Sequence, residues 1–183
     1  MRQTLFSMLI SLLVATATSQ AQQHTLSGQV LDTDNHPIPH VRIEVIRGSK
    51  AIPGESKADG TYAIKFSDGQ TIDSVQYELT GWNPAVISGL SGARDHRINK
   101  TMYQAGSSLT AYQAQEVISA LQTIYQVNRQ RGLSQEELRN KNEPAIDKLN
   151  VPPQFRGQTQ EIKELYGLQE KRQPPYNPEP KPY

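Results

Sequence analysis

The chain has 183 residues and no cysteine. This absence excludes a disulfide framework, a thiolate nucleophile, an acylated lipoprotein cysteine and every zinc or iron–sulfur site with cysteine ligands. An excess of charge is also lacking, because 19 basic and 18 acidic residues leave a formal net charge of +1. Nucleic-acid binding is therefore not expected, since the electrostatic form of that binding needs a strongly basic surface.

Long apolar runs are scarce, and hydrophobic residues make up only 36% of the chain. The one such run, residues 5–17, is shorter than the roughly 20 residues that a membrane-spanning helix needs. It follows Arg2 and precedes small residues at Ser19 and Ala21, which predicts a secretory signal peptide over residues 1–21 rather than a membrane anchor. We therefore expect an exported protein, periplasmic or extracellular, with no membrane span in the mature chain.

Signatures of the common hydrolases and nucleotide-binding enzymes are missing. The sequence contains no His-Glu-x-x-His helix, no Gly-x-Ser-x-Gly elbow and no phosphate-binding glycine loop followed by Lys-Ser or Lys-Thr. We predict from this that the protein is not an enzyme, with no catalytic residues and no cofactor. A hydrolase of unknown type stays open as a third hypothesis, without a polar constellation to support it.

Two groups of potential metal ligands were weighed. His36, His40 and Glu44 have helical spacing, but two prolines interrupt them in a segment that reads as strand. Asp32-x-Asp34-x-His36 resembles the start of a calcium loop, yet it lacks the following glycine and the distal glutamate. Turn-capping carboxylates are the favoured interpretation of this segment, and we predict no metal site.

Residues 22–106 have the pattern of a β domain. Apolar side chains alternate with polar ones over 41–45, 62–66 and 75–79, and pairs such as Asp59-Gly60 are strong turn signals between them. About seven short strands follow one another at the spacing of a β-sandwich. Residues 48–54 are expected to form a loop.

The order of motifs in this region resembles the carboxypeptidase regulatory-like domain family, a transthyretin-like β-sandwich. The resemblance covers residues 24–104 and rests on these segments: Gly28-Gln29-Val30-Leu31-Asp32, Pro37-Ile38-Pro39, Val41 to Val45, Ser56 to Ile64, Val75-Gln76-Tyr77 and Gly81-Trp82. It implies a seven-stranded immunoglobulin- or transthyretin-like sandwich that performs no catalysis. Asn35 and His40 depart from it, since the family usually has glycine at both positions, and Trp82 replaces the usual tyrosine.

Residues 107–172 favour helices. Apolar residues from 110 to 131 recur at i, i+3 and i+4, which predicts one amphipathic helix. Ser134 to Glu137 form a capping box that opens a second helix, which Pro144 is expected to interrupt, and residues 159–170 can form a third. The last segment, 173–183, contains five prolines and is predicted to be a disordered tail.

The apolar stripe of helix 110–131 must be buried somewhere. It can dock on the sandwich or form a homodimer, and the alternative is recognition of a dedicated partner by the helix and the tail. Docking or dimerisation is favoured.

These patterns lead to one main hypothesis and one rival. The main hypothesis is an exported, non-catalytic binding or scaffolding protein of the cell envelope, whose partner is an envelope protein or a polysaccharide. The rival is a carbohydrate-binding or adhesion module in which Trp82 and Tyr77 form an exposed stacking platform. Against the rival, both aromatics can equally be core or rim residues of the sandwich.

Overall fold

The computed structural model describes residues 22–67, 69 and 71–168. The strands of this part are β1 (Gln23–Leu31), β2 (Arg42–Arg47), β3 (Lys50–Glu55), β4 (Thr61–Ser67), β5 (Ile72–Glu78), β6 (Ala85–Leu90), β7 (His96–Arg97) and β8 (Lys100–Thr101). The helices are α1 (Ala111–Gln130), α2 (Gln135–Asp147) and α3 (Arg156–Leu165), and a short 3-10 turn, η1 (Pro153–Phe155), leads into α3. The predicted signal peptide, 1–21, and the predicted tail, 173–183, lie outside the described residues.

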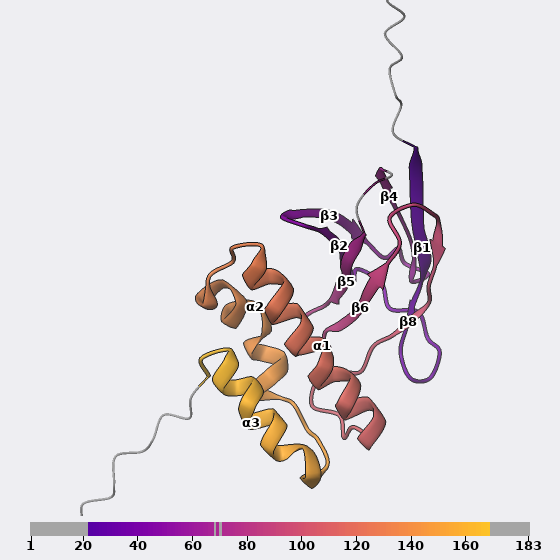
Figure 1. Ribbon diagram of the computed structural model, residues 1–183. Coiled ribbons are helices and arrows are strands. Elements are labelled where there is room, and N and C mark those ends of the chain that lie inside the picture. The colour runs from indigo at the N-terminus through magenta and orange to yellow at the C-terminus, as the bar shows by residue number, and fades with distance from the viewer. Residues whose placement is uncertain (1–21, 68, 70, 169–183) are drawn as a thin grey trace, which may run out of the picture.

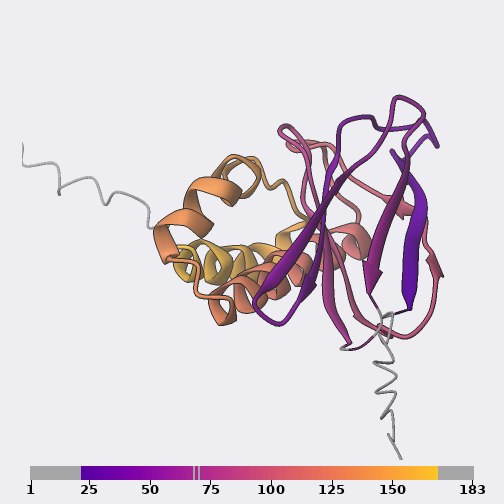
Figure 2. The same cartoon turned by 90° about the horizontal axis from the view of Figure 1, so that it is seen from above.

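The strands form two facing sheets, as Figures 1 and 2 show. One sheet has the order β4-β1-β7, with β8 also pairing to β1, and the other has the order β3-β2-β5-β6. Between them lies a core of fully or almost fully buried side chains, which includes Leu26, Val30, Ile43, Val45, Tyr62, Phe66, Val75 and Tyr77. The predicted β-sandwich is confirmed, and the described chain has eight strands where seven were expected.

The extra strand is β3, in a segment that was predicted to be a loop. It pairs with β2 along its whole length, from Arg47↔Lys50 to Arg42↔Glu55. The sequence does not predict this strand because it contains Pro53 and Gly54, and both residue types are rare in strands. They are tolerated here because β3 ends the order of its sheet, where proline has no second ladder to interrupt.

The two positions where glycine was expected both have a left-handed backbone. Asn35 has φ 64° and His40 has φ 58°. Asparagine enters this region readily, whereas histidine with its larger Cβ substituent does so at a cost. The bend before β2 is therefore kept, and His40 carries the strain.

Replacing His40 by glycine is expected to raise the free energy of unfolding by about 0.5–1 kcal/mol. Relief of a left-handed side-chain conformation gains about 1–2 kcal/mol, and the greater freedom of glycine in the unfolded chain offsets part of it. The lost contact between the His40 Nδ1 and the Glu55 Oε1, at 2.6 Å, is exposed and adds little. Urea denaturation measures the change, and a loss of more than about 1 kcal/mol contradicts this account of the bend.

The helix expected over residues 110–131 forms as α1. Thr110 and Gln113 make a reciprocal capping box at its start, and Gly132, with φ 91°, follows its end. A capping box between Ser134 and Glu137 likewise opens α2. The helix predicted over 110–131 and the capping box predicted at Ser134 are thus confirmed, because both depend only on residues close in sequence.

The later helices differ in detail from their predictions. Pro144 does not interrupt α2 but lies inside it. Pro144 has no N–H to donate to the carbonyl of Asn140, four residues earlier. Both residues are exposed, so water can satisfy that carbonyl. The third helix begins at Arg156, earlier than expected, because η1 leads directly into it, and Gly167 at φ 73° stops it before residue 170.

The helices are not a separate extension, since they cover one face of the sandwich. Figure 1 places α1 beside β5 and β6, and these elements are in contact. The apolar stripe of α1, including Val117, Ile118, Leu121 and Ile124, is buried. Docking on the sandwich, one of the two favoured alternatives, therefore covers the stripe within one chain, and a homodimer through helix 110–131 stays a prediction. In the described part of the chain, no helix combines the length and apolar character needed to cross a membrane.

Candidate functional site

The interface between the β3-β2-β5-β6 sheet and the helices contains buried polar side chains. The amide of Asn128 on α1 donates to Gln76 Oε1 on β5 at 3.0 Å, and Gln76 donates in turn to the Ser74 hydroxyl at 3.2 Å. All three side chains are fully buried. Helix and sheet are therefore held together by paired amides, which would be costly to leave unsatisfied.

Next to these amides lies a cluster of four charged side chains. Lys141 on α2 reaches over the sheet, with its Nζ 2.9 Å from Glu78 Oε1 on β5 and 3.5 Å from Glu44 Oε2 on β2. The guanidinium of Arg42 pairs with the other oxygen of Glu44. The Glu44 and Glu78 side chains are only 8% and 15% exposed, so Lys141 compensates two largely buried carboxylates at once.

Burial raises the pKa of the Glu78 carboxyl above its usual range, although the ammonium of Lys141 acts in the opposite direction. The folded protein therefore retains a proton on Glu78 at pH values where the unfolded chain has lost it. For a carboxyl shifted in this direction, the contribution to stability is fully present below the ordinary pKa of 4.5 and is lost as the pH rises through the raised pKa.

We expect Glu78→Gln to flatten this decline. Above pH 4.5, the free energy of unfolding of the wild type should fall with rising pH more steeply than that of the variant. Urea titrations at several pH values provide the measurement. Hydrogen bonds lower the pKa values of Asp32, Asp59 and Glu137. These groups therefore change the free energy of unfolding only at pH values below the ordinary carboxyl range, and they do so equally in the wild type and in the variant. Parallel pH curves would show that Glu78 does not contribute.

A second charged contact anchors the start of α1. Glu116 pairs with Lys100 of β8 and accepts a hydrogen bond from the Tyr103 hydroxyl at 2.6 Å. Burial opposes ionisation of Glu116, but the hydrogen bonds from Lys100 and Tyr103 outweigh it and lower its pKa. The helical unit is thus fixed to the sandwich at two separate places.

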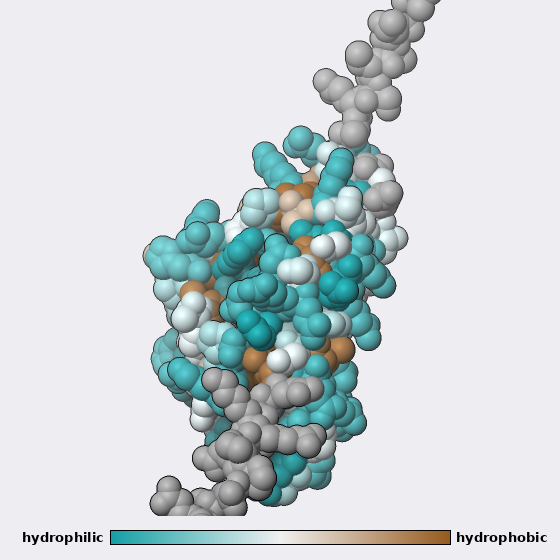
Figure 3. Space-filling view, turned by 90° about the vertical axis from the view of Figure 1, so that its left-hand side faces the viewer, coloured by the Kyte–Doolittle hydropathy of each residue, from teal (hydrophilic) through white to brown (hydrophobic). Residues whose placement is uncertain are grey.

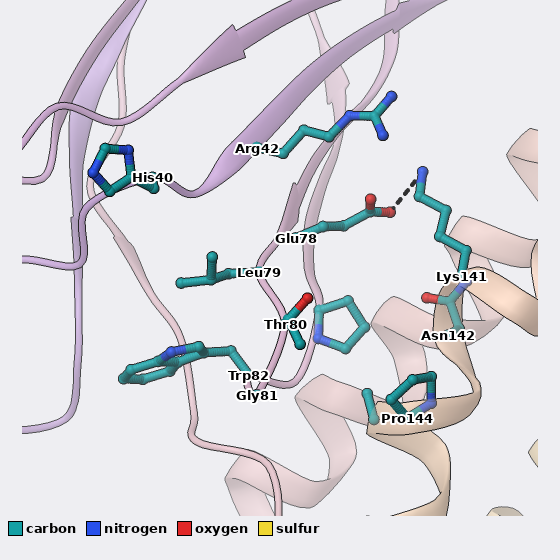
Figure 4. A pocket seen from close by; sticks show the side chains of 12 residues that line it. His40, Arg42, Glu78, Leu79, Thr80, Gly81, Trp82, Lys141, Asn142 and Pro144 are labelled. Atoms are coloured by element: carbon teal, nitrogen blue, oxygen red, sulfur yellow. Dashed lines mark ion pairs between the residues drawn. The ribbon is translucent and has the colours of Figure 1, made fainter.

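Between the sandwich and α2 lies a cavity of about 330 Å³. Residues at and just before β2, from the end of β5 and the chain leading to β6, and from α2 line it: His40, Arg42, Glu78, Leu79, Thr80, Gly81, Trp82, Pro84, Lys141, Asn142, Pro144 and Ala145. Figure 4 shows Trp82 and Leu79 on one side of the cavity and Lys141 with Asn142 on the opposite side. The face of the molecule on the left-hand side of Figure 1 is mostly hydrophilic, with separate apolar patches (Figure 3).

The structure separates the two aromatics that were predicted to form a platform. Tyr77 is fully buried between the sheets, its hydroxyl 2.8 Å from that of Tyr62, which donates to the Ile98 carbonyl at 2.7 Å. The prediction is wrong for Tyr77, because a residue sealed in the core presents no face to a ligand. Trp82 is only partly buried and lines the cavity.

Sequence reasoning did not find the other residues of this cavity. Arg42 and Glu78 are paired across adjacent strands, which the alternating pattern of β2 and β5 could have indicated. Lys141 and Asn142 come from a helix far along the chain, and nothing in their own sequence surroundings points to the sandwich.

The Asp32 segment forms the turn that was predicted for it. Asp32 Oδ1 accepts hydrogen bonds from the backbone nitrogens of Asp34 and His36, both at 2.8 Å. These bonds, the one from His36 above all, lower the Asp32 pKa against the opposing effect of desolvation. The ligand atoms of Asp32, Asp34 and His36 lie within 4.8 Å of one another and could hold a metal ion. The hydrogen bonds of the turn explain the presence of Asp32 without a metal ion.

Comparison with known proteins yields fold neighbours only. No protein-family model matches the chain, and no curated protein matches it. Among solved structures, a mutant type II cohesin–X–dockerin complex from Acetivibrio cellulolyticus aligns over 54% of this chain and 71% of that chain, with 16% identity and a TM-score of 0.39. A DUF3823 family protein from Parabacteroides merdae aligns over 46% of this chain and 48% of that chain, with 14% identity and a TM-score of 0.34.

A third solved structure is an enzyme domain. The dioxygenase domain of a dioxygenase–carbohydrate-binding fusion from Streptomyces sp. SirexAA-E aligns over 49% of this chain and 85% of that chain, with 13% identity and a TM-score of 0.36. At such low similarity we take no function from these proteins. The resemblance to carboxypeptidase regulatory-like domains stays a prediction.

Proposed function

We propose that this protein is an exported, non-catalytic binding module of the cell envelope. Its partner occupies the cavity between the sandwich and α2, and the sandwich belongs to the carboxypeptidase regulatory-like type. The observation that carries the proposal is the arrangement of the cavity walls. Each basic lining side chain is engaged by an acid, and the partly exposed ring of Trp82 remains available as a contact surface.

This arrangement supports recognition more than reaction. Lys141 is held by Glu44 and Glu78, and Arg42 by Glu44, so their charges serve to fix the walls in place. A cavity with apolar surfaces and a few oriented polar groups is the usual form of a binding site. Of the possible partners, a polysaccharide is favoured over a protein, because 330 Å³ accommodates a small unit of an extended chain.

The proposal is tested by binding to fractions of the source cell's envelope. The purified protein is mixed with the polysaccharide fraction and with the protein fraction, and retention is measured for the wild type, Trp82→Ala and Ala145→Trp. The first variant removes the aromatic wall, and the second fills the cavity from α2 without touching the sandwich core. Tyr112→Ala is the control, because Tyr112 is 78% exposed on α1 and does not line the cavity.

We expect retention by the polysaccharide fraction to be lost in both cavity variants and kept in the control. Retention that neither cavity variant affects would contradict the proposed site. Turnover of the retained polysaccharide that is abolished by Glu78→Gln would contradict the non-catalytic assignment and support a hydrolase.

A further inference from the structure

Two ion pairs, whose charges cancel, and one histidine–carboxylate contact lie around the cavity. His40 faces Glu55 at 2.6 Å, Arg42 contacts Glu44, and Lys141 lies 2.9 Å from Glu78. No cation in this set lacks an acidic neighbour. A charged ligand would have to separate one of these pairs, and separating a largely buried pair leaves an uncompensated charge.

The same pairs present both donors and acceptors toward the cavity. Arg42 has five N–H donors and contacts Glu44 through one nitrogen, while carboxylate oxygens can accept more than one hydrogen bond. A hydroxyl group can donate to Glu78 and accept from Arg42 without displacing either partner. Neighbouring hydroxyls of one ligand can therefore be bound while the ion pairs stay intact.

Apolar side chains from both the sandwich and α2 also line the cavity. Trp82 and Leu79 lie on the sandwich side and Pro144 lies on α2 (Figure 4), and Pro84 and Ala145 also line the cavity. The face of an indole ring is electron-rich and attracts the weakly positive C–H groups of a saturated ring. A ligand with one C–H face and a rim of hydroxyls matches both the apolar and the polar lining of this cavity.

From this juxtaposition we infer that the cavity binds a neutral pyranose unit of a polysaccharide, with its ring face on Trp82 and its hydroxyls on Arg42 and Glu78. This inference rests on the proposed function and names the ligand class of the same site. Because α2 supplies Lys141 and one apolar wall, the site is composite and requires the helical unit as well as the sandwich.

The test is calorimetric titration of the full chain with a panel of neutral hexasaccharides, built from glucose, mannose, galactose, xylose or N-acetylglucosamine, and with hexagalacturonate as the acidic counterpart. At least one neutral hexasaccharide should bind more tightly than hexagalacturonate. Its affinity should change less than about twofold between low and high salt, because no net charge is neutralised on binding.

Trp82→Ala should weaken this affinity by at least about tenfold, and Trp82→Phe should recover part of it, since a smaller ring keeps part of the stacking surface. Ala145→Trp should abolish binding, and Tyr112→Ala should leave it unchanged. Thermal unfolding of each variant establishes that it is folded. If Trp82→Ala does not fold, Ala145→Trp decides the matter alone.

Three results would overturn the inference: equal or tighter binding of hexagalacturonate, binding of a neutral sugar that Ala145→Trp does not affect, or no binding of any neutral hexasaccharide. The proposed function fails separately. If an envelope fraction still retains the wild-type protein but not the cavity variants, while no neutral sugar binds, the ligand class is wrong and the proposed binding module stands.

Discussion

Replacing Lys141 by methionine should lower the free energy of unfolding by about 3 kcal/mol. Methionine keeps the apolar stem but removes the ammonium that lies between Glu44 and Glu78, whose side chains are 8% and 15% exposed. Removing one partner of a buried ion pair costs about 3–5 kcal/mol, and the partial exposure of Lys141 places the expected value at the lower end. Urea denaturation at pH 7 measures the loss.

The chain offers a matched control and a rescue for this prediction. Lys148→Met changes an exposed lysine just after α2 and should alter stability by less than about 0.5 kcal/mol. Adding Glu44→Gln and Glu78→Gln to Lys141→Met should restore part of the loss, because the stranded charges are then removed. A loss below about 1 kcal/mol for Lys141→Met would mean that water, not Lys141, compensates the carboxylates.

Gly28→Ala should destabilise the protein by about 3 kcal/mol or more. An added Cβ at this position would lie 1.7 Å from the Ile98 carbonyl oxygen and 2.5 Å from its carbon. That carbonyl is fixed, since the Ile98 nitrogen donates to Ser27 at 2.8 Å and its oxygen accepts from Tyr62. Overpacking that displaces backbone costs roughly 1–3 kcal/mol and occasionally more. Here the displacement would also break the contact between β1 and the backbone at Ile98.

The control for this substitution is Gly157→Ala in α3. A Cβ there meets no atom within 4 Å, and the backbone is helical, so alanine should stabilise the protein by about 0.5–1 kcal/mol. Opposite signs for the same chemical change are the expected result, measured by denaturation of both variants. A Gly28→Ala variant as stable as the wild type would show that β1 and the Ile98 segment are not in close contact.

The sequence predicted what depends on near neighbours in the chain. Alternation placed most of the strands, the i, i+3 and i+4 pattern placed α1, and the capping box at Ser134 placed the start of α2. The same alternation could have predicted that Tyr77 is buried. It lies two residues from Val75, and both are buried, so Tyr77 shares the core-facing side of β5.

What the sequence could not supply is the pairing of distant segments. Glu78 and Lys141 come from a strand and a helix that have no shared pattern, and only the docking of α2 brings them together. Strand β3 was missed for a related reason, because its pairing with β2 outweighs the poor strand propensity of Pro53 and Gly54. The cavity is a product of this docking and has no counterpart in any single segment.

The central claim is that sandwich and helices together form one binding site. It is tested most directly by backbone NMR of the protein titrated with the polysaccharide fraction of the source envelope. Shifts should change together around Trp82, between β5 and β6, and around Asn142 on α2, which line opposite sides of the cavity. Shift changes confined to the outer face of β1 and β4, or to the exposed face of α1 around Tyr112, would contradict the claim.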